Sequence, residues 1–228
     1  MDAVEKYFID KNLPGYQILK KDPFMLSLLF KAFFWRSQLI IIKGLYIEKF
    51  IPAAETLDEE VQKEVNQSDN YGLILDFQEV SSVYETIRFG YLAMYHKYES
   101  FYREYFPLLA KYFKKDVKEI RKLFKEKLDF NVEKPEKGII YKFCWISDCF
   151  KHQNSIASDR NDPPSRFIDY PKNTKIFIDP IEFKNDCDLF ILEYNKIIQS
   201  TILVATFMDN EMDNEIISDK IKQLIKLI

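Results

Sequence analysis

The chain has 228 residues, of which 47% are hydrophobic and 16% aromatic, with only five glycines and nine prolines. Its 33 Lys and Arg residues nearly balance 36 Asp and Glu residues, which gives a formal net charge of −3. This composition excludes a globally basic nucleic-acid coat protein and a chain that is mainly disordered. Because no low-complexity linker divides the sequence, we expect a single domain over residues 1–228 with its core at about 22–207.

The cysteines and the N-terminal sequence predict a cytoplasmic protein. Cys144, Cys149 and Cys187 are odd in number and form no CxxC motif, which favours a reducing compartment. The N-terminal stretch carries acidic residues from its second position and lacks the apolar segment of a secretory signal. The most apolar stretches, 24–47 and 197–208, are interrupted by charges or too short for a bilayer. We therefore expect neither export nor membrane association.

Apolar spacing predicts helices from the N-terminus onward. A short polar helix is expected at 3–11, and Asp22-Pro23 has the form of an N-cap followed by the first residue of a helix. The apolar residues of 24–47 recur every three or four positions and cover most of the circumference of that helix. The acidic stretch at 55–69 predicts a short exposed helix followed by a loop.

Helical spacing continues through the rest of the chain. Residues 79–113 predict a long helix that Gly90 or Pro107 bends or ends, and further helices are expected at 111–128, 139–153, 180–207 and 214–228. Only TKIFID at 174–179 alternates as a strand does. The expected fold class is therefore all-α, an antiparallel helical bundle with at most a short β segment near 174–179.

A basic helix is predicted at 111–128, where eight cations stand against three carboxylates and apolar residues keep helical spacing. The cations form either a solvated helix face or a surface that contacts phosphate groups. In the second interpretation the RNA-binding residues are Lys114, Lys115, Lys118, Arg121, Lys122 and Lys125, together with Arg160 in the later polar loop.

Few residues are candidates for catalysis. The sequence has no glycine-rich phosphate loop, no HExxH and no GxSxG motif. Of the two histidines, His96 is interpreted as a structural or surface residue, whereas His152 ends a predicted helix just before a polar loop. Cys149 lies three residues before His152, but zinc needs three or four ligands and a cysteine nucleophile needs in-line geometry. We expect no metal and no cofactor.

The order of elements resembles the HEPN superfamily of prokaryotic helical bundles over roughly residues 22–207. The resemblance rests on two long aromatic-rich helices (one containing MYHKYESFYREYF at 94–106), a helix ending in ISDCFKHQNSIAS, a polar loop, KIFID and a closing helix. It implies metal-independent RNA cleavage by a histidine and an arginine at a homodimer interface. It also implies a toxin–antitoxin or phage-defence setting, with an antitoxin-like protein partner.

Within the motif, His152 matches the family's histidine and Asp148 matches the polar residue after the arginine. The arginine position itself is Ser147, which cannot neutralise a phosphate charge. A ribonuclease would then take its cation from Lys151 or Arg160, with Asn154 helping to orient the phosphate.

Three functions stay open at this point. The first is a ribonuclease with His152 as its acid and base, and the second is a catalytically silent bundle that binds RNA or a nucleotide through 111–127 and the loop after His152. The third is a non-enzymatic interaction module whose exposed aromatic surface forms a dimer or holds a partner.

Overall fold

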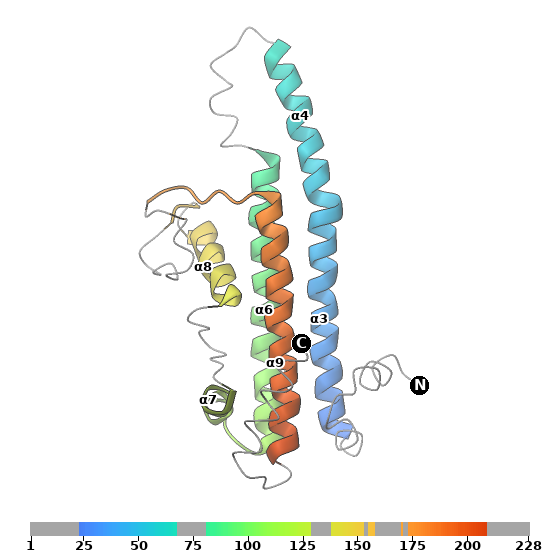
Figure 1. Ribbon diagram of the computed structural model, residues 1–228, viewed down its shortest axis with the longest axis vertical. Coiled ribbons are helices and arrows are strands. Elements are labelled where there is room, and N and C mark those ends of the chain that lie inside the picture. Colours follow the sequence, from blue (N-terminus) through green and yellow to red (C-terminus); the bar gives the residue numbers. More distant parts are fainter. Residues whose placement is uncertain are drawn as a thin grey trace. The chain divides into compact units, whose positions relative to one another are not determined.

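Helices make up nearly all of the structure (Figure 1), a computed structural model that describes residues 23–67, 81–128, 138–152, 155–157, 170 and 173–208. Among these residues the only β structure is an isolated antiparallel bridge between Ile156 and Lys175. The prediction of an all-α fold with at most a short β segment is confirmed. The helices predicted at 3–11 and 214–228 lie outside the described residues.

The helix boundaries agree with the sequence patterns to within a few residues, with three differences. The helix predicted at 111–128 begins only at Val117, because 111–113 belong to the preceding helix and a turn follows them. The helix predicted at 79–113 passes through both Gly90 and Pro107, so neither residue ends it. A π-helical turn joins the first two helices, and the second of them begins earlier than its acidic pattern suggested. The elements are α3 (Pro23–Leu45), η1 (Tyr46–Phe50), α4 (Ile51–Gln67), α6 (Ser82–Phe113), α7 (Val117–Leu128), α8 (Ile139–His152) and α9 (Pro180–Met208).

The chain divides into two compact units, each assembled from stretches that are far apart in sequence. Unit 1 comprises Met1–Arg36, Phe101–Pro135 and Tyr194–Ile228, and unit 2 comprises Ser37–Ser100 and Glu136–Glu193. The long helices α3, α6 and α9 each contribute residues to both units. The expectation of a single domain stays a prediction.

Aromatic side chains dominate the core of unit 1. The rings of Phe101 and Tyr194 lie 4.7 Å apart between their centroids, and the Tyr194 hydroxyl donates a hydrogen bond of 3.0 Å to the carbonyl oxygen of Ala32. These contacts join α6, α9 and α3. The Arg121 guanidinium lies 4.9 Å from the ring centroid of Tyr102, so a cation–π contact adds to the packing of α7 against α6.

The core of unit 2 is a second aromatic cluster, where α6, α8 and α9 meet. The ring of Phe143 lies 4.5 Å from that of Tyr91 and 4.4 Å from that of Phe190. Phe183 of α9 also packs against α6, with its ring centroid 5.1 Å from that of Tyr91. A Cβ at the neighbouring Gly90 would stand only 2.4 Å from the Phe183 ring. The close approach of α9 to α6 therefore requires a residue without a side chain.

Helix α4 is fixed to the start of α6 by one carboxylate. Asp58 accepts hydrogen bonds from the backbone N–H groups of Ser82 and Val83 at 2.8 and 3.2 Å and from the Ser81 hydroxyl at 2.7 Å. It thus serves as an N-cap supplied by another helix. Partial burial raises the pKa of Asp58, but these hydrogen bonds outweigh it and the net pKa is lowered.

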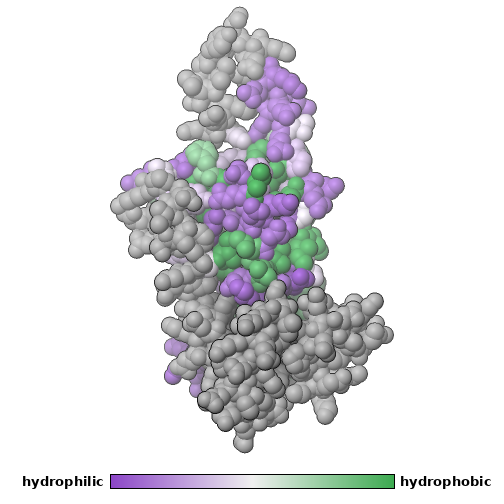
Figure 2. All heavy atoms as spheres, viewed as in Figure 1, coloured by the Kyte–Doolittle hydropathy of each residue, from purple (hydrophilic) through white to green (hydrophobic). Residues whose placement is uncertain are grey.

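The surface of unit 2 is polar along α4 and mixed polar and apolar elsewhere. Figure 2 shows hydrophilic side chains on α4 and hydrophobic side chains that reach the surface on the face it presents. The large apolar side chains exposed on α3 and α9 in this unit are Ile40, Ile41, Leu45, Ile181, Leu189 and Leu192.

Candidate functional site

The end of α8 carries three of the four predicted catalytic residues. Lys151 and His152 are exposed in its last turn, and Asp148 is half-buried one turn earlier. Asn154 and the alternative cation Arg160 lie outside the described residues. The structure therefore brings Asp148, Lys151 and His152 to one end of one helix, as their sequence spacing predicted.

No activated thiol accompanies His152 among the described residues. Cys149 is almost fully buried, whereas His152 is exposed. Burial raises the pKa of the Cys144 thiol, although its hydrogen bond with Tyr95 opposes the shift. A raised pKa leaves Cys144 protonated and weakly nucleophilic near neutral pH.

Position 147, which the HEPN resemblance assigns to an arginine, lies in the core. Ser147 is fully buried, and its hydroxyl donates a hydrogen bond of 3.4 Å to the carbonyl oxygen of Tyr91 on α6. A guanidinium at this position would be surrounded by side chains instead of solvent or substrate. Position 147 is therefore a packing position between α8 and α6.

Arg88 on α6 contacts the end of α8 directly, and the sequence patterns did not predict this contact. Its Nη2 donates a hydrogen bond of 2.8 Å to the carbonyl oxygen of Phe150, and its Nη1 lies 3.3 Å from both oxygens of Glu85. The side chain thus caps the carboxyl end of α8, where a cation complements the helix dipole. Its spacing from Tyr84 and Tyr91, both buried on the same face of α6, indicates a partly buried arginine but does not identify its partner on α8.

Beyond His152 the backbone turns and pairs with the segment before α9. Ser155 has a positive φ of 67°, and its N–H donates to the carbonyl oxygen of Cys149, six residues back, so it satisfies one of the last carbonyl groups of α8. Ala157 then donates to Thr174 at 2.8 Å, and Ile176 donates to Ser155 at 2.8 Å. These bonds hold the residues after α8 beside those that precede α9.

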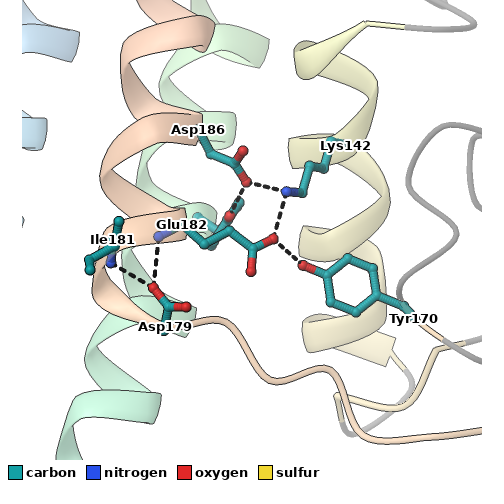
Figure 3. A network of polar contacts seen from close by, with 7 residues as sticks. Lys142, Tyr170, Asp179, Ile181, Glu182 and Asp186 are labelled. Carbon is teal, nitrogen blue, oxygen red and sulfur yellow. Dashed lines mark hydrogen bonds and ion pairs between the residues drawn. The ribbon is translucent and has the colours of Figure 1, made fainter.

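A buried polar network joins α6, α8 and α9 (Figure 3). The Lys142 ammonium, in a residue only 5% exposed, lies 2.8 Å from Glu182 and 2.5 Å from Asp186. Tyr170 donates its hydroxyl hydrogen to Glu182 at 2.5 Å, and Tyr91 donates to Asp186. Each of the two carboxylates therefore pairs with the Lys142 ammonium and also accepts a hydrogen bond from one tyrosine hydroxyl.

The start of α9 fixes one of these carboxylates. Asp179 accepts hydrogen bonds of 2.8 Å from the backbone N–H groups of both Ile181 and Glu182 (Figure 3). With Pro180 as the first helical residue, this is the N-cap and N1 pattern that the sequence also shows at Asp22-Pro23. The cap sets the backbone from which Glu182 reaches Lys142.

The network contains one cation and two carboxylates, and the pKa values of Asp186 and Tyr91 are both raised. Burial raises the pKa of Asp186 above its ordinary value of 3.8, and Lys142 offsets the shift only in part. Burial, followed by the charge of Asp186, also raises the pKa of Tyr91, so this hydroxyl stays neutral and remains a donor.

We expect the Asp186→Asn variant to be more stable than the parent chain at pH 7, with an advantage that shrinks as the pH falls. A raised carboxyl pKa means that the folded state binds the proton more tightly than the unfolded state. The contribution of Asp186 to stability therefore rises as pH falls through its folded pKa toward 3.8. Denaturant unfolding of both chains between neutral and acidic pH measures this difference, and a constant difference contradicts it.

The predicted basic helix presents its lysines on the surface of unit 1. Its first turn is closed by a capping box, in which Asp116 accepts from the N–H of Glu119 at 2.7 Å and Glu119 accepts from that of Asp116 at 3.0 Å. The two carboxylates are therefore engaged with backbone. We call five lysines on and just before α7 the α7 cationic face: Lys111 in the last turn of α6, Lys114 and Lys115 in the connecting turn, and Lys118 and Lys122 on α7; all are exposed except Lys115, which is half-buried.

Two further predicted RNA-binding residues differ from this set. Arg121 is half-buried with its guanidinium against the Tyr102 ring, so it supports the helix as well as adding charge. Lys125 belongs to α7, but its side chain lies outside the described residues.

Searches for other types of site and for similar proteins gave no match. Within the described ranges, no three His, Cys, Asp or Glu side chains gather as metal ligands would. The same part of the chain contains no helix with the length and apolarity that crossing a bilayer requires. No protein-family model, curated protein or solved structure significantly matches the chain.

Proposed function

We propose that this chain is an HEPN-like helical protein that binds RNA or a nucleotide and does not cleave it. The proposal rests above all on the α7 cationic face, where four exposed lysines lie within twelve residues, from the last turn of α6 through the connecting turn to α7. Cations held on a rigid element neutralise phosphates and release their counterions, which is the main source of sequence-independent affinity for nucleic acids.

The packing of α7 supports a binding role for its lysines. Ile120 is fully buried and Arg121 contacts the Tyr102 ring, so the opposite side of the helix anchors it to unit 1. The lysines are left on the solvent side, where they add little to folding. A surface of this kind suits a polyanion because its charges are fixed in position before the ligand binds.

Binding without cleavage follows from the end of α8. Ser147 is a core residue, so no cation occupies the position at which the family's arginine would meet the scissile phosphate. Arg88 is already engaged with the Phe150 carbonyl and with Glu85. His152 can exchange a proton but cannot itself stabilise the charge that develops on phosphorus, and the Lys151 ammonium in the same turn lies 6.0 Å from the Tyr95 ring centroid, in a cation–π contact.

The salt dependence of RNA binding tests the proposal. For the parent chain we expect affinity for a labelled single-stranded RNA to fall steeply from about 50 to about 200 mM salt. Replacing Lys111, Lys114, Lys118 and Lys122 with Gln should lower the slope of log K against log salt by about 3, at roughly 0.7 for each phosphate contact. Fluorescence anisotropy measures both quantities.

A matched control changes the same number of exposed charges on another helix. Replacing Glu55, Glu59, Glu60 and Glu64 of α4 with Gln should leave the salt slope unchanged. If the parent chain does not bind RNA even at low salt, the proposal fails. The interaction module would then be the better interpretation, since large apolar side chains are exposed on α3 and α9.

A further inference from the structure

The segment that follows α8 and the segment that precedes α9 share one outward-facing surface. Ile156 and Lys175 are partners in the isolated bridge, so their side chains lie on the same side, and Phe177 follows two residues later on that side. The alternate residues Ile176 and Ile178 are buried, at 0% and 6% exposed. By contrast, Ile156 is 41% exposed and Phe177 is 55% exposed.

An aromatic pair and an ammonium group meet on this surface. The Tyr84 and Phe177 ring centroids lie 5.4 Å apart, and the Lys175 Nζ lies 5.2 Å from the first ring and 5.6 Å from the second. Tyr84, in the first turn of α6, is buried and contacts both Phe177 and Lys175, so it supports these two side chains from the core side. We call Tyr84, Ile156, Lys175 and Phe177 the Phe177 shelf.

We propose that the Phe177 shelf binds one unstacked base of a single-stranded nucleic acid, an inference that rests on the proposed function. The base would stack on the exposed face of Phe177, and Lys175 would contact the adjoining phosphate. An aromatic face beside a cation is the combination by which proteins hold single strands, because every base has a π-face and every nucleotide has a charge. The bases of a duplex are already stacked and cannot occupy the shelf.

The nearby charges permit a phosphate at this position. The carboxylate closest along α6, Glu85, is paired with Arg88 one turn later. Arg88 itself neutralises the carboxyl end of α8 through the Phe150 carbonyl. Two further carboxylates are nearby, and both accept backbone hydrogen bonds: Asp179 from Ile181 and Glu182, and Asp58 from the first turn of α6. Lys175 is the cation of the shelf, and two rings position its ammonium.

Phe89 provides a matched control on the same unit. It is 56% exposed, almost the same as Phe177, and the described residues give it no ring partner and no cation–π partner. Exposed aromatic area is therefore equal at the two positions, and only Phe177 combines that area with a cation.

The experiment uses the full chain with two probes of equal length, a single-stranded RNA and an abasic strand that has phosphates but no bases. We expect Phe177→Ala to weaken binding of the RNA about five- to tenfold and to leave binding of the abasic strand unchanged. Phe177→Tyr should bind the RNA as the parent does, and Phe89→Ala should change neither affinity. Lys175→Gln should weaken binding of both probes.

Equal RNA affinities for Phe177→Ala and Phe89→Ala would overturn the shelf proposal. Circular dichroism checks folding, and if the alanine variant unfolds, Phe177→Leu removes the aromatic face while keeping most of the apolar area, with the same expected result. The proposed function fails separately, when the variant with the four exposed lysines of the α7 cationic face changed to Gln binds the abasic strand as tightly as the parent chain.

Discussion

The Lys142→Met variant is expected to lose about 3 to 5 kcal/mol of its free energy of unfolding. Met has a similar length to Lys but no charge, so the substitution leaves Glu182 and Asp186 without the ammonium that lies 2.8 and 2.5 Å from them. Asp186 is buried, and an unpaired buried carboxylate must either ionise at high cost or take up a proton. Guanidinium unfolding at pH 7 measures the loss.

Two controls separate the charge effect from any effect of packing. Adding Glu182→Gln and Asp186→Asn to Lys142→Met removes all three charges and should restore most of the stability, because neutral amides still accept the tyrosine hydroxyl hydrogens. Lys151→Met changes an exposed lysine on the same helix and should alter stability by less than about 0.5 kcal/mol. If Lys142→Met is no more damaging than Lys151→Met, the network does not stabilise the fold.

The second large effect is expected for Phe143→Ala, with a loss of about 3 to 5 kcal/mol. Phe143 is fully buried, and its ring lies between those of Tyr91 on α6 and Phe190 on α9. Removing the ring leaves a cavity where three helices of unit 2 meet, and rigid neighbours cannot collapse to fill it. Denaturant unfolding measures the loss.

Phe89→Ala and Phe143→Leu are the controls for this cavity. Phe89 is more than half exposed, so its truncation should cost less than about 0.5 kcal/mol. Leu fills part of the space at position 143 and should give an intermediate loss. Equal losses for Phe89→Ala and Phe143→Ala would contradict the location of the core at this ring.

The helices could be predicted because their apolar spacing is local and extends over many turns. The same spacing also predicts that Ser147 is buried. It lies four residues after Phe143 and three before Phe150, on the same face of α8. A serine between two core phenylalanines on that face is a core residue by position. A motif comparison depends on residue type alone and does not include the position of Ser147 on the helix.

The polar contacts were beyond the reach of sequence patterns, because they join distant residues. Lys142 pairs with Glu182 forty residues later, and Arg88 donates to a carbonyl sixty-two residues away. Periodicity shows which face of a helix is buried but not which residue of another helix meets it. From sequence alone, Lys142 would be expected to reach solvent, because its two carboxylate partners come from another helix.

The π-helical turn between α3 and α4 takes up one residue beyond those of a regular α-helix. A π-turn contains one more residue than an α-turn, and each residue turns an α-helix by about 100°. The extra residue is thus taken up within the turn, and deleting it from Tyr46–Phe50 would restore regular α-helix with α4 in nearly the same phase. A deletion between the turn and Asp58 has no such compensation and would rotate Asp58 by that angle away from the first turn of α6. Changes in chain length are therefore tolerated within the π-turn and constrained just after it.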